Sequence, residues 1–155
     1  MTTASGEREV PEPRADVWRA LAVLEPYCAV CDVSYVLGGA GGPGVGTTFV
    51  CVPGQLGGTT PGAGAPRGEI LEWDEPRLVV SRLDLTPERW TTRIELTETP
   101  AGGTLVSITL THEPVGGSRV VRSLQRRALR RLVQRTVDEE LVKVPAHVAR
   151  ATNTS

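Results

Sequence analysis

Cys28 and Cys31 form a C-x-x-C spacing, the arrangement with the most evident chemistry in this 155-residue chain. This spacing occurs both in redox-active thiol pairs and in zinc sites. A redox pair needs a helix N-terminus beneath it to lower a thiol pKa, but residues 32–37 that follow have a strand-like pattern. In a strand, positions three apart point to opposite faces. We therefore expect separate structural thiols here.

The other potential soft metal ligands are Cys51, His112 and His147. They stand at no recognised zinc-binding spacing from the C-x-x-C pair or from one another. The sequence accordingly predicts no metal, and no cofactor is expected.

His112 is the histidine best placed to act on a ligand. It continues the alternation of Val106, Ile108 and Leu110, so it should lie on the face of its strand that points to the protein interior. A histidine in that position is either a core residue or a cavity-lining donor or general base, because its ordinary pKa lies near physiological pH. The sequence leaves both interpretations open.

Two aromatic residues are the best candidates for stacking on a ligand. Tyr35 and Trp90 each combine a ring with a hydrogen-bond donor, so they can stack and donate at once. The full predicted ligand-binding set joins them to nearby apolar and basic residues: Tyr35, Arg82, Trp90, Ile94, Ile108, His112, Arg126 and Arg130.

The two arginines at 126 and 130 depend on how a long C-terminal helix is turned. Its apolar residues form two roughly opposite stripes, Val121, Leu124, Ala128 and Leu132 on one side and Val133, Val137, Leu141, Val144 and Val148 on the other. If the second stripe faces the sheet throughout, the arginines point toward a cavity mouth and can bind carboxylate, enolate or phenolate oxygens. If the helix bends so that the first stripe also faces inward, they stay in solvent.

The elements expected to position these residues are a strand meander followed by that helix. Period-two alternation predicts strands over about 90–97 and 106–112, and glycine and proline mark the turn between them. The same signals place further strands at 7–10, 30–37, 47–52, 68–74 and 78–83, a short helix at 14–23, and the long helix from Ser118 to about 144.

Residues 10–18, 44–49 and 68–78, with 103–106 leading into the last strand, resemble the helix-grip superfamily of START domains, birch-pollen-type allergens and bacterial polyketide cyclases. The resemblance implies an α+β helix-grip fold. In it, a curved antiparallel sheet of about seven strands wraps around one long C-terminal helix, with short helices after the first strand. A single domain over 1–155 is expected, with a mobile loop at about 53–67 and a short flexible tail after about 149.

The resemblance also implies a cavity between sheet and helix that binds a hydrophobic small molecule, of the polyketide-like specialised metabolite class. One alternative is a polyketide aromatase/cyclase, in which Arg82, His112 or Arg126 stabilises an enolate. Another is a self-sacrifice or sequestration resistance protein for an enediyne-type antibiotic. The sequence contains no paired-carboxylate motif and no nucleophile beside a base, so it leaves open whether the chain is an enzyme.

Composition narrows the classes of partner. Net charge is −1, with 8 basic and 15 acidic residues over 1–116 against 9 basic and 3 acidic over 117–155. Nucleic-acid binding is not expected, because the basic excess is local and has no aromatics beside it.

The longest apolar run has five residues, 20–24, so no membrane insertion is expected. With a polar N-terminal segment and three free thiols, a cytoplasmic location is predicted, and the oligomeric state stays open.

Overall fold

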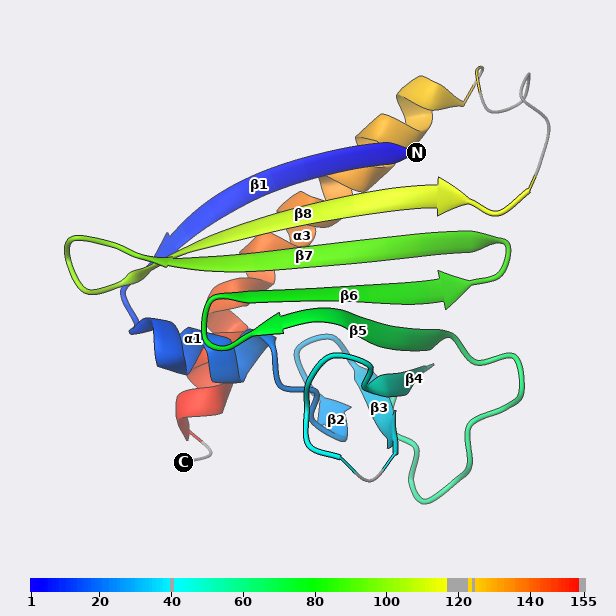
Figure 1. Ribbon diagram of the computed structural model, residues 1–155, viewed down its shortest axis with the longest axis horizontal. Coiled ribbons are helices and arrows are strands. Elements are labelled where there is room, and N and C mark those ends of the chain that lie inside the picture. Colours follow the sequence, from blue (N-terminus) through cyan, green and yellow to red (C-terminus); the bar gives the residue numbers. More distant parts are fainter. Residues whose placement is uncertain (40, 117–122, 124, 154–155) are drawn as a thin grey trace.

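An eight-stranded antiparallel sheet and a long helix across one of its faces make up the fold (Figure 1). The structure is a computed structural model that describes residues 1–153 except 40, 117–122 and 124. Its elements in chain order are β1 (Thr2–Val10), α1 (Arg14–Leu21), β2 (Tyr27–Cys28), β3 (Val33–Gly38), β4 (Thr48–Pro53), β5 (Arg67–Asp74), β6 (Leu78–Leu85), β7 (Glu88–Glu98), β8 (Thr104–Pro114) and α3 (Arg126–Asn153).

The strand order β1-β8-β7-β6-β5-β4-β3-β2 is a meander whose first strand returns to pair with the last. This arrangement confirms the predicted α+β helix-grip fold. The sheet has one strand more than expected, because residues 27–28 pair with β3 as a short edge strand. In Figure 1, α3 runs behind the sheet from the N-terminal end of β1 toward α1.

The core lies between the inner face of the sheet and α3. Alternation along β7 and β8 places Ile94 opposite Ile108, and Gly6 of β1 follows in the same row. The helix contributes the stripe predicted to face inward, since five of its residues are buried: Val133, Val137, Leu141, Val144 and Val148. A large side chain on α3 can approach β1 closely because position 6 carries no side chain.

β1 is longer than the four residues predicted from 7–10. Its polar N-terminal half gives almost no hydrophobic signal, since Ala4 is its one buried side chain. The outer face is held instead by hydroxyl pairs, Thr3 Oγ1 to Thr111 Oγ1 at 3.1 Å and Ser5 Oγ to Thr109 Oγ1 at 3.0 Å. Cross-strand pairs of this kind stabilise a sheet without apolar residues.

α3 continues through Pro145 to Asn153, past both the expected helix end at 144 and the expected tail after about 149. Ser118, the predicted first residue, lies outside the described residues. Proline has no N–H, so the carbonyl of Leu141 loses its helical donor. The Arg8 guanidinium replaces it, with Nη1 3.4 Å from the Leu141 oxygen. This contact from β1 explains how the helix tolerates an internal proline.

We expect Arg8→Met to lower the free energy of unfolding by about 1 kcal/mol, the usual contribution of one hydrogen bond. In a Pro145→Ala background the restored N–H satisfies Leu141, so the same change should cost almost nothing. Urea unfolding of the four proteins measures this coupling. An equal cost in both backgrounds would show that Arg8 acts elsewhere.

Candidate functional site

A cavity of about 260 Å³ lies between the inner face of the sheet and the C-terminal half of α3. Its walls come from α1 and the segment after it, from β3, β4, β6, β7 and β8, and from α3. Most of the lining is apolar, including Ala20, Leu21, Leu24, Phe49, Leu83, Ile94, Ile108 and Val144. Such a space favours a small, largely apolar ligand.

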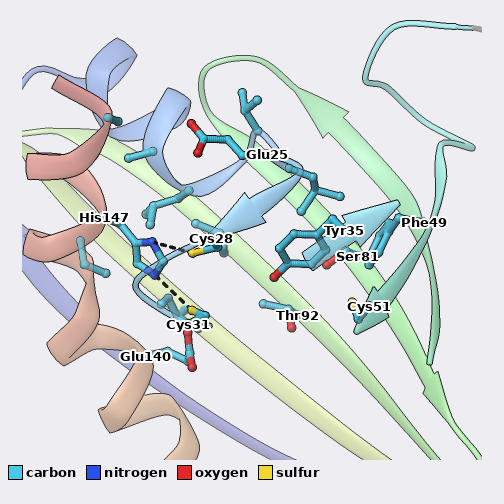
Figure 2. A pocket seen from close by; sticks show the side chains of 18 of the residues that line it. Glu25, Cys28, Cys31, Tyr35, Phe49, Cys51, Ser81, Thr92, Glu140 and His147 are labelled. Atoms are coloured by element: carbon cyan, nitrogen blue, oxygen red, sulfur yellow. Dashed lines mark hydrogen bonds between the residues drawn. The ribbon is translucent and has the colours of Figure 1, made fainter. Parts of the chain in front are cut away.

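Three hydroxyl groups interrupt this apolar lining. Tyr35 lies together with Ser81 and Thr92 on one side of the cavity, and Ser81 pairs directly with Thr92 across β6 and β7 (Figure 2). Burial raises the pKa of the Tyr35 phenol, so it stays protonated and can donate a hydrogen bond. The cavity therefore offers a ligand oxygen both a donor and acceptors at one point.

Phe49 shapes the wall next to Tyr35. Its ring meets the Tyr35 ring edge-on, with centroids 6.0 Å apart. The ring also lies directly over Gly68 of β5, where an added Cβ would stand 2.1 Å from Phe49 Cζ. Phe49 keeps its position because residue 68 is glycine.

Cys28, Cys31 and His147 meet on the other side of the cavity (Figure 2). Cys28 Sγ lies 3.8 Å from His147 Nδ1, and Cys31 Sγ lies 3.5 Å from His147 Nε2. The expectation that the two cysteines point to opposite faces is wrong. Cys28 ends β2 and Cys31 belongs to the turn before β3, so both thiols point toward α3.

Contacts on both sides hold this turn in place. Asp32 has a left-handed backbone with φ 53°, and its Oδ1 accepts a 2.7 Å hydrogen bond from the Tyr27 hydroxyl. On the helix side, Arg150 Nη2 donates to the Tyr27 carbonyl at 3.0 Å. Arg150 lies one helical turn after His147, so the same contact fixes the imidazole relative to the two thiols.

The electrostatics of this cluster do not favour an activated nucleophile. Burial, and next the neighbouring Cys28, raises the pKa of the Cys31 thiol to about 11, whereas reactive cysteines have lowered values. Burial lowers the pKa of His147, which keeps the imidazole neutral at physiological pH. A neutral imidazole can bind a metal ion directly, whereas each thiol must first lose its proton.

The cavity contains three of the predicted ligand-binding residues, Tyr35, Ile94 and Ile108. Trp90 and His112 also lie on the inner face of the sheet, but they do not line this cavity. Their rings pack on each other with centroids 4.8 Å apart. His112 is 2 % exposed, and its Nε2 lies 3.5 Å from Glu88 Oε2. Both ring nitrogens are buried without a hydrogen-bond partner among the described residues, so the choice between its two possible roles stays a prediction.

The three predicted arginines lie away from the cavity. Arg82 points to the outer face of the sheet, opposite to Ser81 and Leu83, where its Nη2 is 3.0 Å from Glu69 Oε2. Arg126 and Arg130 are exposed. The inward orientation considered for them is therefore wrong.

The alternative orientation is right that these two arginines stay in solvent but wrong about the apolar stripe. It placed Leu124, Ala128 and Leu132 on the inward side, but Ala128 and Leu132 are exposed, and Leu124 lies outside the described residues. The physical reason is that the second stripe faces the sheet from Val133 onward, which leaves Leu132 on the opposite, solvent side of α3. The turns before Val133 extend past β1 (Figure 1).

Several lining residues were absent from the prediction: Cys28, Cys31, Phe49, Cys51, Ser81, Thr92, Glu140 and His147. Thr92 could have been found, because it lies on the same face of its strand as Trp90 and Ile94, which were predicted to line the cavity. Ser81 was missed because the inward prediction for Arg82 turned its neighbour outward. His147 carries a weaker signal, since it lies three positions after Val144 on the inward side of α3. Its approach to Cys28 is a tertiary contact that no local spacing records.

No family model and no curated protein sequence matches the chain. Solved structures do match. The Zhui aromatase/cyclase from Streptomyces sp. R1128 is similar with a TM-score of 0.71 and 14% identity, over 97% of this chain and 94% of that one. TTHA0849 from Thermus thermophilus is similar with a TM-score of 0.67 and 23% identity, over 99% of both chains. Ara h 8.0201 is similar with a TM-score of 0.64 and 17% identity, over 97% of both chains. At these identities the likeness supports the shared fold.

Within the part of the chain that the structure describes, no helix is long and apolar enough to span a membrane. The longest helix, α3, carries charged residues along most of its length and buries a single stripe.

Proposed function

We propose that the protein binds a small hydrophobic molecule with an oxygen substituent, of the polyketide-like class, in the cavity between α3 and the sheet. The observation that carries this proposal is the apolar cavity with hydroxyl groups gathered at one point. Tyr35 donates to the ligand oxygen, Ser81 and Thr92 accept from its hydroxyl, and the apolar walls enclose the rest.

The size of the cavity limits the ligand. Drug-sized ligands occupy sites of about 300–1,000 Å³, and this cavity of about 260 Å³ lies just below that range. A molecule of one to two rings fits that volume better than an extended polycycle. An intact enediyne-type antibiotic would require the walls to open, so sequestration of such a molecule is the less supported alternative.

The aromatase/cyclase alternative draws support from the likeness to Zhui aromatase/cyclase. The residues expected to stabilise an enolate, Arg82, His112 and Arg126, do not line the cavity. Tyr35 remains as the hydroxyl that could polarise a ketone there. Binding without turnover is the function that the arrangement of groups supports best.

We expect the purified protein to bind 2-naphthol more tightly than naphthalene, because only 2-naphthol has an oxygen for the hydroxyl cluster. Tyr35→Phe should weaken 2-naphthol binding by about tenfold, about 1.4 kcal/mol, and leave naphthalene binding unchanged. Thr91→Val is the control, since its hydroxyl lies on the outer face of β7, opposite to the cavity-lining Thr92. Fluorescence titration measures all four affinities.

A cavity-filling variant makes the test independent of one hydrogen bond. Ala20 of α1 lines the cavity, so Ala20→Phe should abolish binding of both naphthalene and 2-naphthol. Unchanged binding in this variant would place the ligand elsewhere and overturn the proposal. Conversion of a linear poly-β-ketone to an aromatic product would establish the cyclase alternative in its place.

A further inference from the structure

We infer that Cys28, Cys31 and His147 form a Zn²⁺ site with one coordination position open to the cavity. The three ligand atoms already lie within 4.8 Å of one another, and all three side chains line the cavity. This inference goes beyond the proposed function, because binding of the metal ion alone requires no hydrophobic ligand.

The distances suit tetrahedral coordination. With Zn–S of about 2.3 Å and Zn–N of about 2.0–2.1 Å, a sulfur and a nitrogen on one ion stand about 3.5 Å apart. In the structure the two sulfurs lie beside different ring nitrogens, Cys31 Sγ 3.5 Å from His147 Nε2 and Cys28 Sγ 3.8 Å from His147 Nδ1. One nitrogen binds the ion, so the imidazole must rotate on binding until that nitrogen faces both sulfurs. Two thiol protons leave to solvent as the thiolates bind.

The ligand types select a borderline-soft ion. Two thiolates and a neutral imidazole are ligands that Zn²⁺ favours, whereas Mg²⁺ and Ca²⁺ require oxygen ligands. Two thiolates also neutralise the dipositive ion, so the half-buried site carries no net charge. The C-x-x-C turn supplies both sulfurs from one short segment, as it does in many zinc proteins.

The structure is consistent with an open fourth position. Glu140 also lines the cavity wall, but its carboxylate does not belong to the group of atoms within 4.8 Å. Its Oε1 is held by Lys143 Nζ at 2.9 Å. Three protein ligands with a free position are typical of zinc sites that bind or activate a small molecule. Here that position faces the space assigned to the organic ligand.

The site is preorganised by contacts that core packing alone would not require. The Tyr27–Asp32 bond shapes the turn that carries the cysteines, and Arg150 joins that strand to the helix that carries His147. Metal ligands are commonly oriented by such outer contacts. The protein therefore loses little entropy when the ion binds.

Cobalt titration of the full chain, reduced and freed of metal by a chelator, tests this inference. One Co²⁺ per chain should bind, with the intense visible bands of tetrahedral cobalt and a thiolate charge-transfer band, and one Zn²⁺ should displace it. Cys28→Ser, Cys31→Ser and His147→Ala should each weaken Zn²⁺ binding by at least about 10²-fold, more than loss of an outer contact costs.

Cys51→Ser is the matched control, because Cys51 is a free, half-buried thiol of the same cavity that lies outside the three-residue group. It should retain full Zn²⁺ affinity. Circular dichroism of each variant establishes that the fold persists. Adding thiophenol, which fits an apolar cavity, should shift the cobalt bands by occupying the open position.

Three results would overturn the inference: no stoichiometric metal in the reduced protein, an equal loss of affinity in Cys51→Ser, or a Cys28–Cys31 disulfide that persists under reducing conditions. A cobalt spectrum insensitive to thiophenol would contradict the open position. Naphthalene binding measured without metal stays an independent readout, so failure of the metal site and failure of the hydrophobic cavity are distinguishable.

Discussion

Gly68→Ala should both destabilise the protein and weaken ligand binding. The added Cβ would stand 2.1 Å, 2.2 Å and 2.8 Å from three atoms of the Phe49 ring, far inside contact distance. The ring is rigid and only 6 % exposed, so it cannot yield by a small rotation. We expect the unfolding free energy to fall by about 3 kcal/mol, the upper end for overpacking.

Binding should fall because Phe49 also lines the cavity. The outer part of its ring, Cζ and both Cε atoms, lies against Gly68, so an added Cβ pushes the ring away from β5. Displacement into the cavity removes the volume that the ligand needs, so affinity for 2-naphthol should drop by at least about tenfold. Urea unfolding and fluorescence titration measure the two effects on one sample.

Two further variants isolate this steric cause. Gly62→Ala is the control, because a Cβ there meets no heavy atom within 4 Å and its stability should match that of the unmodified protein. In a Phe49→Leu background, Gly68→Ala should cost less than about 1 kcal/mol, since the smaller, flexible side chain can move aside. A full cost in that background would assign the effect to the strand backbone.

The sheet could be predicted from sequence because its central strands carry a local signal. Along β7 and β8, each inward residue is followed by an outward one, and the sequence shows the same alternation of apolar and polar residues. The inward stripe of α3 could be predicted for the same reason, through Val137, Leu141 and Val144. Both patterns depend on burial by a single partner surface.

Elements stabilised by tertiary contacts could not be predicted in this way. The N-terminal half of β1 pairs through hydroxyl groups, and Pro145 remains helical because Arg8, 133 positions from Leu141 in sequence, serves the Leu141 carbonyl. Local propensity predicts neither a strand at residues 2–6 nor a helix through Pro145. In each case the hydrogen-bond partner that stabilises the element comes from a segment remote in sequence.

The cavity was predicted only in part because its polar groups come from many elements. Tyr35, Ile94 and Ile108 each carry a strand pattern that shows an inward face. The cluster of Cys28, Cys31 and His147 required two facts that spacing does not contain, that a turn separates the cysteines and that α3 reaches them. The prediction that Arg126 and Arg130 face the cavity was wrong because it assumed that the sheet covers the whole helix, whereas the first turns of α3 extend past the sheet.

Gly6→Val should separate α3 from the sheet and cost about 3 kcal/mol of unfolding free energy or more. A Cβ at position 6 would stand 2.6 Å from Leu141 Cδ1 and 3.1 Å from Val137 Cγ1, and the two methyl groups of valine reach further toward the helix. Glu7→Val on the exposed side of the same strand is the control and should cost under about 0.5 kcal/mol. Leu141→Ala removes the nearest atoms, so the double variant should be more stable than the sum of the single changes predicts by over about 1 kcal/mol. Additive losses in urea unfolding would mean that helix and strand do not meet at glycine 6.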